Sequence, residues 1–118
     1  MSYAQRLVIP VTTIADGSQT SYSDFFTGEI VSVTYAKTDF ANGVDFTITL
    51  EATGESLWTD TDINASETVY PVAPANLGSS GAASVLLQVP LVAVNDRVKF
   101  VIASGGNTKS GTFHVVVK

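Results

Sequence analysis

The chain has 118 residues, a net charge of −5 at pH 7 and no cysteine; 45% of its residues are hydrophobic and 14% are charged. This length predicts a single domain, residues 1–118. The acidic balance argues against a nucleic-acid partner, which needs clustered Lys and Arg, and the missing cysteines exclude a disulfide framework and a thiolate metal site. No apolar run approaches the ~20 residues of a membrane-spanning helix, so no membrane partner is expected.

The low charge content is informative, because an ordinary soluble domain has about 25% charged residues. It indicates that partners or other copies of the chain cover much of the exterior. Residues 1–6 lack the basic and apolar pattern of a secretory signal, so we expect synthesis and folding in the cytoplasm.

Short segments rich in Val, Ile, Thr, Phe and Tyr, separated by Gly, Asn, Asp and Ser, predict an all-β fold. We expect a single antiparallel β-sandwich of about eight strands, either jelly-roll or immunoglobulin-like. The expected strands cover residues 5–14, 29–37, 44–51, 56–59, 68–72, 85–94, 97–104 and 111–118, with a short further segment at 22–26.

The first expected strand contains Pro10, which predicts an edge position or a bulge because proline cannot donate a backbone hydrogen bond. The dipeptide Asp16-Gly17 then predicts a turn. In the segment 29–37, three alternating residues are expected to share one face: Val31, Val33 and Tyr35.

The segment 44–51 alternates most cleanly, with an apolar face formed by Val44, Phe46, Ile48 and Leu50. The turn dipeptide Asn42-Gly43 precedes it, so we expect 29–37 and 44–51 to pair as a hairpin. Residues 105–110 predict a second hairpin between the last two strands. The inward residues of those strands are expected to be Val98, Phe100, Ile102, Phe113, Val115 and Val117. Residues 71–84, with two prolines and two glycines, predict an ordered or semi-flexible loop.

Candidate metal ligands are few. His114 is the only histidine; it points away from the core on this alternation, so a surface or interface role is expected. The run from Asp60 to Asn64 resembles the opening of an EF-hand loop, but Ala65 and Pro71 replace the Gly and Glu that such a loop requires. An irregular oxygen-ligand site stays open beside the alternative that these side chains cap their own turns.

The remaining motifs do not indicate catalysis. Residues 105–110 are not a phosphate-binding loop, because Thr108 rather than glycine precedes Lys109. No Ser-His-Asp arrangement or working carboxylate pair can be argued, so we expect no enzyme, no catalytic residue, no metal and no cofactor. Trp58 with Tyr3, Tyr22, Tyr35 and Tyr70 leaves a sugar-stacking platform open, although a single tryptophan in a β-sandwich usually lies in the core or an interface.

Two segments, Leu7–Val11 and Val85–Val94, are apolar without alternation. An antiparallel strand with solvent on one side should alternate, so these segments either lie between layers or meet another subunit. We expect a homo-dimer or homo-trimer contact formed by Leu7, Val8, Ile9, Val11, Leu87, Val89, Leu91 and Val92. Replacing Leu91 or Val92 by Asp is expected to disperse the oligomer without unfolding the monomer.

Several motifs are similar to those of a known family: Tyr35–Thr49, Gly54–Thr59, Asn64–Ser66, Tyr70-Pro71 and, most strongly, Asn95–Val115. Over roughly residues 28–118 they resemble a family of small tailed-bacteriophage proteins encoded with head-morphogenesis genes. The motifs mark a fold rather than a catalytic site, and residues 78–94 depart from the family pattern. The resemblance implies a virion structural protein, best placed as a decoration (cement) protein on the capsid exterior that bridges subunits of the major capsid protein.

On that placement, two loops are expected to touch the shell through Asp60, Asp62, Asn64, Pro74, Asn76 and Leu77. The acidic charge suits an outer surface, because a protein that faces DNA should be basic. A neck or tail component and a carbohydrate-binding surface module stay open as alternatives. A tail-tube subunit normally needs long hairpins that join a ring, and the expected loops are too short for that.

Overall fold

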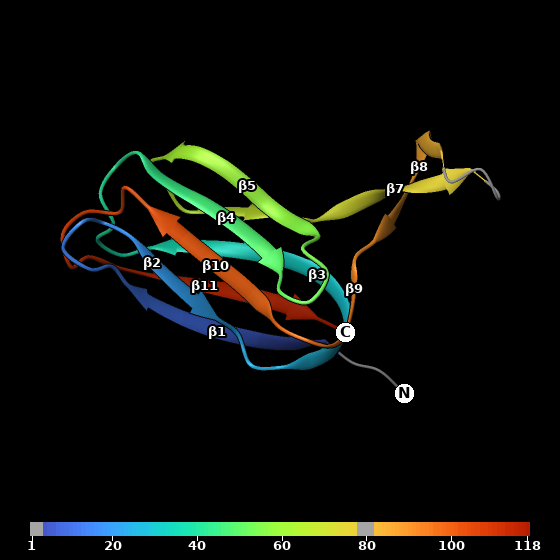
Figure 1. Cartoon of the computed structure of the whole chain (residues 1–118), viewed down its shortest axis with the longest axis horizontal. Coiled ribbons are helices and arrows are strands. Elements are labelled where there is room, and N and C mark those ends of the chain that lie inside the picture. Colours follow the sequence, from blue (N-terminus) through green and yellow to red (C-terminus); the bar gives the residue numbers. More distant parts are fainter. Residues whose placement is uncertain (1–3, 78–81) are drawn as a thin grey trace.

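The computed structural model describes residues 4–77 and 82–118, without the side chains of residues 74–87 (Figure 1). All regular structure in this part of the chain is β, which confirms the all-β prediction. The strands are β1 (Gln5–Thr12), β2 (Gln19–Tyr22), β3 (Phe26–Lys37), β4 (Val44–Leu50), β5 (Ser56–Ile63), β6 (Glu67–Val69), β7 (Val72–Leu77), β8 (Ala82–Pro90), β9 (Val92–Asp96), β10 (Val98–Ala103) and β11 (Ser110–Val117).

The strands form two main sheets and a separate hairpin, all with antiparallel pairing. One sheet has the order β1-β11-β3-β6, with β9 also paired to β3, and the other has the order β2-β10-β4-β5. The two sheets together are called the body below. Strands β7 and β8 pair only with each other in the described ladders and are called the arm. The described residues therefore form eleven strands in two sheets and a hairpin, where a single sandwich of about eight strands was expected.

Four aromatic rings join the two sheets in the core of the body. Phe113 of β11 lies 5.0 Å from Phe46 of β4 and 4.9 Å from Phe100 of β10, measured between ring centroids. Tyr35 of β3 lies 4.8 Å from Phe46. The predicted inward faces are confirmed, because every one of these residues is buried: Val44, Phe46, Ile48, Leu50, Val98, Phe100, Ile102, Phe113, Val115 and Val117.

Both predicted hairpins are wrong, for the same physical reason. β3 pairs with β11, β6 and β9, whereas β4 pairs with β10 and β5, so β3 and β4 face each other across the core. β10 and β11 likewise belong to opposite sheets. Alternation identifies the face that a strand buries. It does not distinguish a neighbour in the same sheet from a strand that packs on that face from the other layer.

Hydrogen bonds join the loop between β1 and β2 to the loop between β10 and β11 at one end of the body. The Asp16-Gly17 turn is confirmed: Gly17 N donates to Ile14 O over 3.0 Å, and Gly17 has φ +84°. A Cβ at Gly17 would lie 3.0 Å from Gly106 N, so the close approach also requires glycine. Thr13 Oγ1 donates to Gly106 O over 2.6 Å, which links this turn to the connection between β10 and β11.

Two further predictions concern single residues of the first sheet. Pro10 lies on β1, an edge strand paired only with β11, as its missing N–H required. Val31 is only half-buried, because the register of β3 against β11 shifts between Val116 and Val117. Ile30 occupies the buried position instead.

The arm replaces the loop predicted at residues 71–84. Its register runs from Val72 opposite Pro90 to Leu77 opposite Ala82, and Figure 1 shows it projecting from one end of the body. The Cα radius of gyration, 15.1 Å, exceeds the about 13.5 Å of a compact domain of this length. Prolines misled the prediction, because the free edges of a two-stranded ribbon tolerate proline.

Candidate functional site

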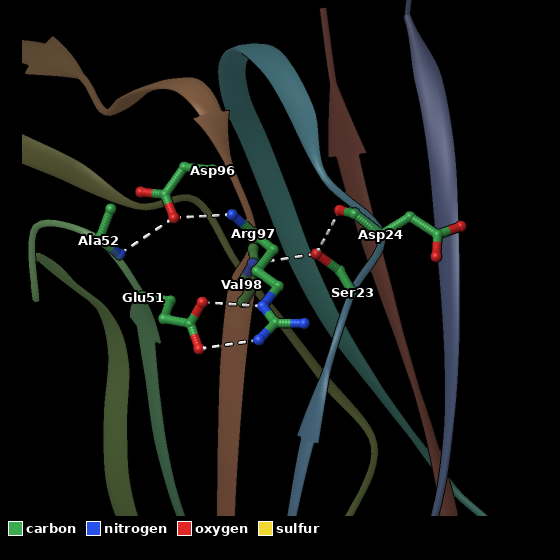
Figure 2. Close-up of polar contacts among 7 residues, drawn as sticks. All are labelled: Ser23, Asp24, Glu51, Ala52, Asp96, Arg97 and Val98. Carbon is green, nitrogen blue, oxygen red and sulfur yellow. Dashed lines mark hydrogen bonds and ion pairs between the residues drawn. The ribbon is translucent and has the colours of Figure 1, made fainter.

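An ion pair between Arg97 and Glu51 lies just before β10 (Figure 2). The guanidinium of Arg97 binds both carboxylate oxygens of Glu51, with Nε–Oε1 at 2.8 Å and Nη2–Oε2 at 3.1 Å. The same guanidinium carbon lies 4.0 Å from the ring centroid of Tyr22 and 4.9 Å from that of Phe25. The bidentate ion pair and the contacts with two aromatic rings together hold the planar guanidinium in one orientation.

Buried polar groups hold this cluster in place. Asp96 is almost fully buried, and its Oδ1 accepts hydrogen bonds from the backbone N–H groups of Ala52 and Arg97. Ser23 Oγ accepts from Val98 N over 2.9 Å and donates to Asp24 O over 2.9 Å. These bonds tie the end of β9 to the β4–β5 turn and the start of β10 to the segment after β2.

The electrostatics of the cluster are those of an exposed pair. The hydrogen bond from Arg97 lowers the pKa of Glu51, and the nearby positive charge acts in the same direction. The hydrogen bond to Glu51 raises the pKa of Arg97. Both groups therefore keep their charges at neutral pH.

A groove opens beside this cluster, between the edge strands of the two sheets. Its volume is about 430 Å³, and β1 and β2 contribute its walls. The lining residues from β1 are largely apolar, whereas the other wall is polar; together they are Arg6, Leu7, Val8, Ile9, Pro10, Ser21, Tyr22, Ser23 and Asp24. This set is called the β1–β2 groove below.

Exposed apolar side chains lie on both faces of the chain where the arm leaves the body. Val72 lies opposite Pro90 in the arm register, which brings the chain segments 70–72 and 89–94 together. Five large residues of these segments are exposed, by 44% to 73%: Tyr70, Val72, Val89, Val92 and Val94. They are called the root patch below.

The structure divides the residues expected at a subunit contact. Ile9, Val11 and Leu91 lie in the core of the chain itself, so they are covered without a partner and cannot form a surface. Leu91 falls between β8 and β9 and points inward where one continuous strand was expected. Because Leu91 is buried in the core, Leu91→Asp is now expected to destabilise the monomer.

The other expected contact residues are placed differently. Val8, Val89 and Val92 are exposed, and Leu7 is half-buried against the core. The side chain of Leu87 lies outside the described residues. A subunit contact through Val8, Val89 and Val92 stays a prediction.

Asp60 and Asp62 belong to β5, which continues to Ile63 where a loop was expected. Asp60 Oδ1 accepts from Thr61 N over 2.8 Å. Asn64 Oδ1 accepts from Gly43 N over 2.7 Å. The bond of Asp60 fits the alternative in which these side chains cap their own turn, whereas the bond of Asn64 joins it to the distant turn before β4. For Pro74, Asn76 and Leu77 the structure gives the backbone of β7, and their side chains lie outside the described residues.

His114 is half-buried on the outer face of β11, as the alternation predicted. Its Nδ1 lies 3.4 Å from Arg6 Nη1, a cation rather than a partner ligand. Within residues 4–77 and 82–118, no three His, Cys, Asp or Glu side chains are grouped so that they could hold a metal ion.

Trp58 does not form the sugar-stacking platform that was left open. Its side chain is buried, and its ring packs edge-on against Phe46 at 5.4 Å between centroids. Tyr35 is also buried, whereas Tyr22 is partly occupied by Arg97. Tyr3 lies outside the described residues. Trp58 and Tyr35 therefore belong to the core, whereas Tyr70 is exposed.

One buried hydroxyl has no function in this arrangement. Tyr35 Oη has no hydrogen-bond partner, and among the described residues it is the only buried side-chain polar atom in that position. Burial raises the pKa of Tyr35 to about 12, with a contribution from the charge of Asp39. Its ring packs against Phe40, Phe46 and Phe113, so its role is to fill the core.

Sequence reasoning missed the Arg97 cluster and the arm. The cluster joins residues from three distant segments, and nothing in the sequence links Arg97 with Glu51, Tyr22 or Phe25. The arm did leave a signal: residues 68–95 contain no Asp, Glu, Lys, Arg or His.

No family model matches the chain, and no curated protein matches it. In the part of the chain that the structure describes, there is no helix with the length and apolar character needed to cross a membrane.

Proposed function

We propose that this chain is a non-enzymatic structural protein of a tailed-phage virion, and that it decorates the capsid exterior as a cement protein. The observation that carries the proposal is the arm, an uncharged hairpin that leaves the body beside a root patch of exposed apolar residues. A hairpin of this kind can lie across a neighbouring subunit and bury apolar surface there. The resemblance to small tailed-phage proteins is the reason for proposing a phage virion as the particle that the chain binds.

The body suits a passive, durable role. Its core is closed by aromatic contacts between the two sheets. A protein that binds only the assembled shell opposes rupture of that shell by mass action. The major capsid protein and other copies of the chain are the proposed partners. The net charge of −5 suits the outer side of a shell filled with DNA.

We also propose an architecture for the body. We assign the body to the β-sandwich architectures, jelly-roll or immunoglobulin-like, because its two antiparallel sheets bury their inner faces against each other. The protein would be made in the host cytoplasm and act on the virion.

One observation favours a second candidate, a neck or tail component. Short loops were the reason to set aside a tail-tube subunit, and the arm removes that reason. Subunits of a ring can join through such hairpins. A carbohydrate-binding module has less support, because Trp58 and Tyr35 are buried.

Copy number and position in purified particles separate the two candidates. The cement role predicts hundreds of copies on the head, and particles without the protein should rupture at lower temperature or under milder osmotic shock. Adding back the purified protein should restore resistance. A dozen copies at the neck, or a location along the tail, would contradict the cement role and favour the second candidate.

An arm-shortened variant sharpens the test. Residues 75–87 can be replaced by a two-residue Asn-Gly turn, because Pro74 and Gln88 are paired in the arm. This variant should fold but fail to protect particles. Ile14→Glu is a matched control, since Ile14 is exposed in the loop after β1, away from the arm; it should protect as well as the native protein.

A further inference from the structure

The arm has prolines in its strands, but it lacks the charged side chains that protect isolated hairpins. A two-stranded hairpin is marginally stable in water at best, and β7 and β8 pack mainly on each other. Their outer edges have no partner in the described ladders. Natural proteins guard such edges with charged side chains, above all Lys, yet the arm and its flanks from 68 to 95 have none. The arm is therefore built to be covered.

The distribution of charge along the chain limits which partners can cover the arm. The whole chain has a net charge of −5, and all of that charge lies outside residues 68–95. Two copies of the body repel each other wherever acidic surfaces approach. The arm is the segment through which one copy can touch another without that repulsion.

The β1–β2 groove has complementary properties. Arg6 and Asp24 are its two charged residues, so its lining has no net charge. Val8 and Pro10 add exposed apolar surface. β1 and β2 are both edge strands, which pair with β11 and β10 but not with each other. A groove with open strand edges accepts an extended segment by adding it to a sheet.

We propose that the arm of one copy occupies the β1–β2 groove of a second copy, so that the chain assembles head to tail. Figure 1 shows the arm projecting away from the side of the body on which β1 and β2 lie, so the arm cannot fill the groove of its own copy. A contact between two different surfaces closes into a ring or extends as a filament. This inference goes beyond the proposed function and does not depend on the phage assignment.

The first test measures the mass of the purified full-length protein by sedimentation at increasing concentration. The native chain should form species larger than the 12.4 kDa monomer. Val89→Glu in the arm and Val8→Glu in the groove should each weaken the association at least tenfold, because each places a charge in an apolar contact. Ile14→Glu, which adds the same charge at a similarly exposed site, should assemble as the native chain does.

The second test mixes the two weakened variants. In a head-to-tail contact the intact groove of Val89→Glu can receive the intact arm of Val8→Glu, so the mixture should form a dimer although each variant alone is monomeric. Far-ultraviolet circular dichroism checks that both variants are folded. A native chain that stays monomeric at millimolar concentration overturns the proposal, as does a mixture that stays monomeric or a Val8→Glu variant that assembles normally.

Discussion

The body and the arm follow opposite rules, although they belong to one short chain. In the body, apolar residues alternate along β4, β10 and β11, and the two sheets cover each other's inner faces. In the arm, charge is absent and the exposed valines Val72 and Val89 remain uncovered. Charged residues are therefore distributed unevenly along the chain. None lies in residues 68–95, the segment that forms the arm and its root.

The largest expected effect comes from emptying the core of the body. Phe113 is fully buried and contacts three other aromatic rings, so Phe113→Ala should lower the free energy of unfolding by about 3–5 kcal/mol. Chemical denaturation followed by circular dichroism measures this. Val94→Ala is the control, because Val94 is 73% exposed and should change stability little. Equal effects at both positions would contradict the account in which Phe113 belongs to the core and Val94 does not.

Two consecutive residues mark the boundary between the regions. Leu91 is 4% exposed and Val92 is 51% exposed, so Leu91→Ala should destabilise the monomer by about 2–5 kcal/mol. Val92→Ala should change monomer stability by less than about 1 kcal/mol. Urea denaturation at low protein concentration measures both variants. A similar loss in both would show that the root of the arm is part of the core.

The unpartnered hydroxyl in the core predicts a smaller effect of opposite sign. Tyr35→Phe removes a buried group without a hydrogen bond, so the variant should be more stable by roughly 1 kcal/mol. The raised pKa adds a pH test, since the unfolded tyrosine ionises near 10 and the folded one near 12. Between these values the native protein should lose stability that Tyr35→Phe retains. A variant that is clearly less stable at pH 7 would indicate a partner for the hydroxyl.

The smallest effect is expected at the exposed ion pair. The pKa of Glu51 in the folded protein lies below its ordinary value of 4.5 because of Arg97. The contribution of the pair is therefore present above pH 4.5 and should disappear as the pH falls through the folded value. Glu51→Gln should be slightly less stable than the native protein at pH 7 and equal to it in acid. Glu55→Gln, which removes a charge without breaking an ion pair found in the described residues, should show no such convergence.

Local patterns predicted faces well and partners poorly. The burial of Phe46, Phe100 and Phe113 followed from period-two alternation, and the edge position of Pro10 followed from its missing N–H. Turn dipeptides such as Asn42-Gly43 identified where the chain reverses. They did not show that it reverses across the core, since a hairpin and a crossing loop use the same residues.

The arm and the Arg97 cluster could not be predicted for a different reason. Prolines and glycines between Pro71 and Ser84 are typical of a loop, and only the pairing of β7 with β8 shows a hairpin. The ion pair between Arg97 and Glu51 depends on the fold, which brings the start of β10 beside the end of β4. Leu91 was assigned to a contact because an unbroken apolar run does not reveal the break between β8 and β9.

Hydrogen exchange measured at high and low protein concentration tests the central claim most directly. The account predicts that backbone amides of β4 and β10 are protected at both concentrations, because the body covers them. Amides of β7 and β8 should be protected at high concentration and exchange rapidly on dilution, because only another molecule covers the arm. Protection of the arm that is unchanged on dilution would contradict the account.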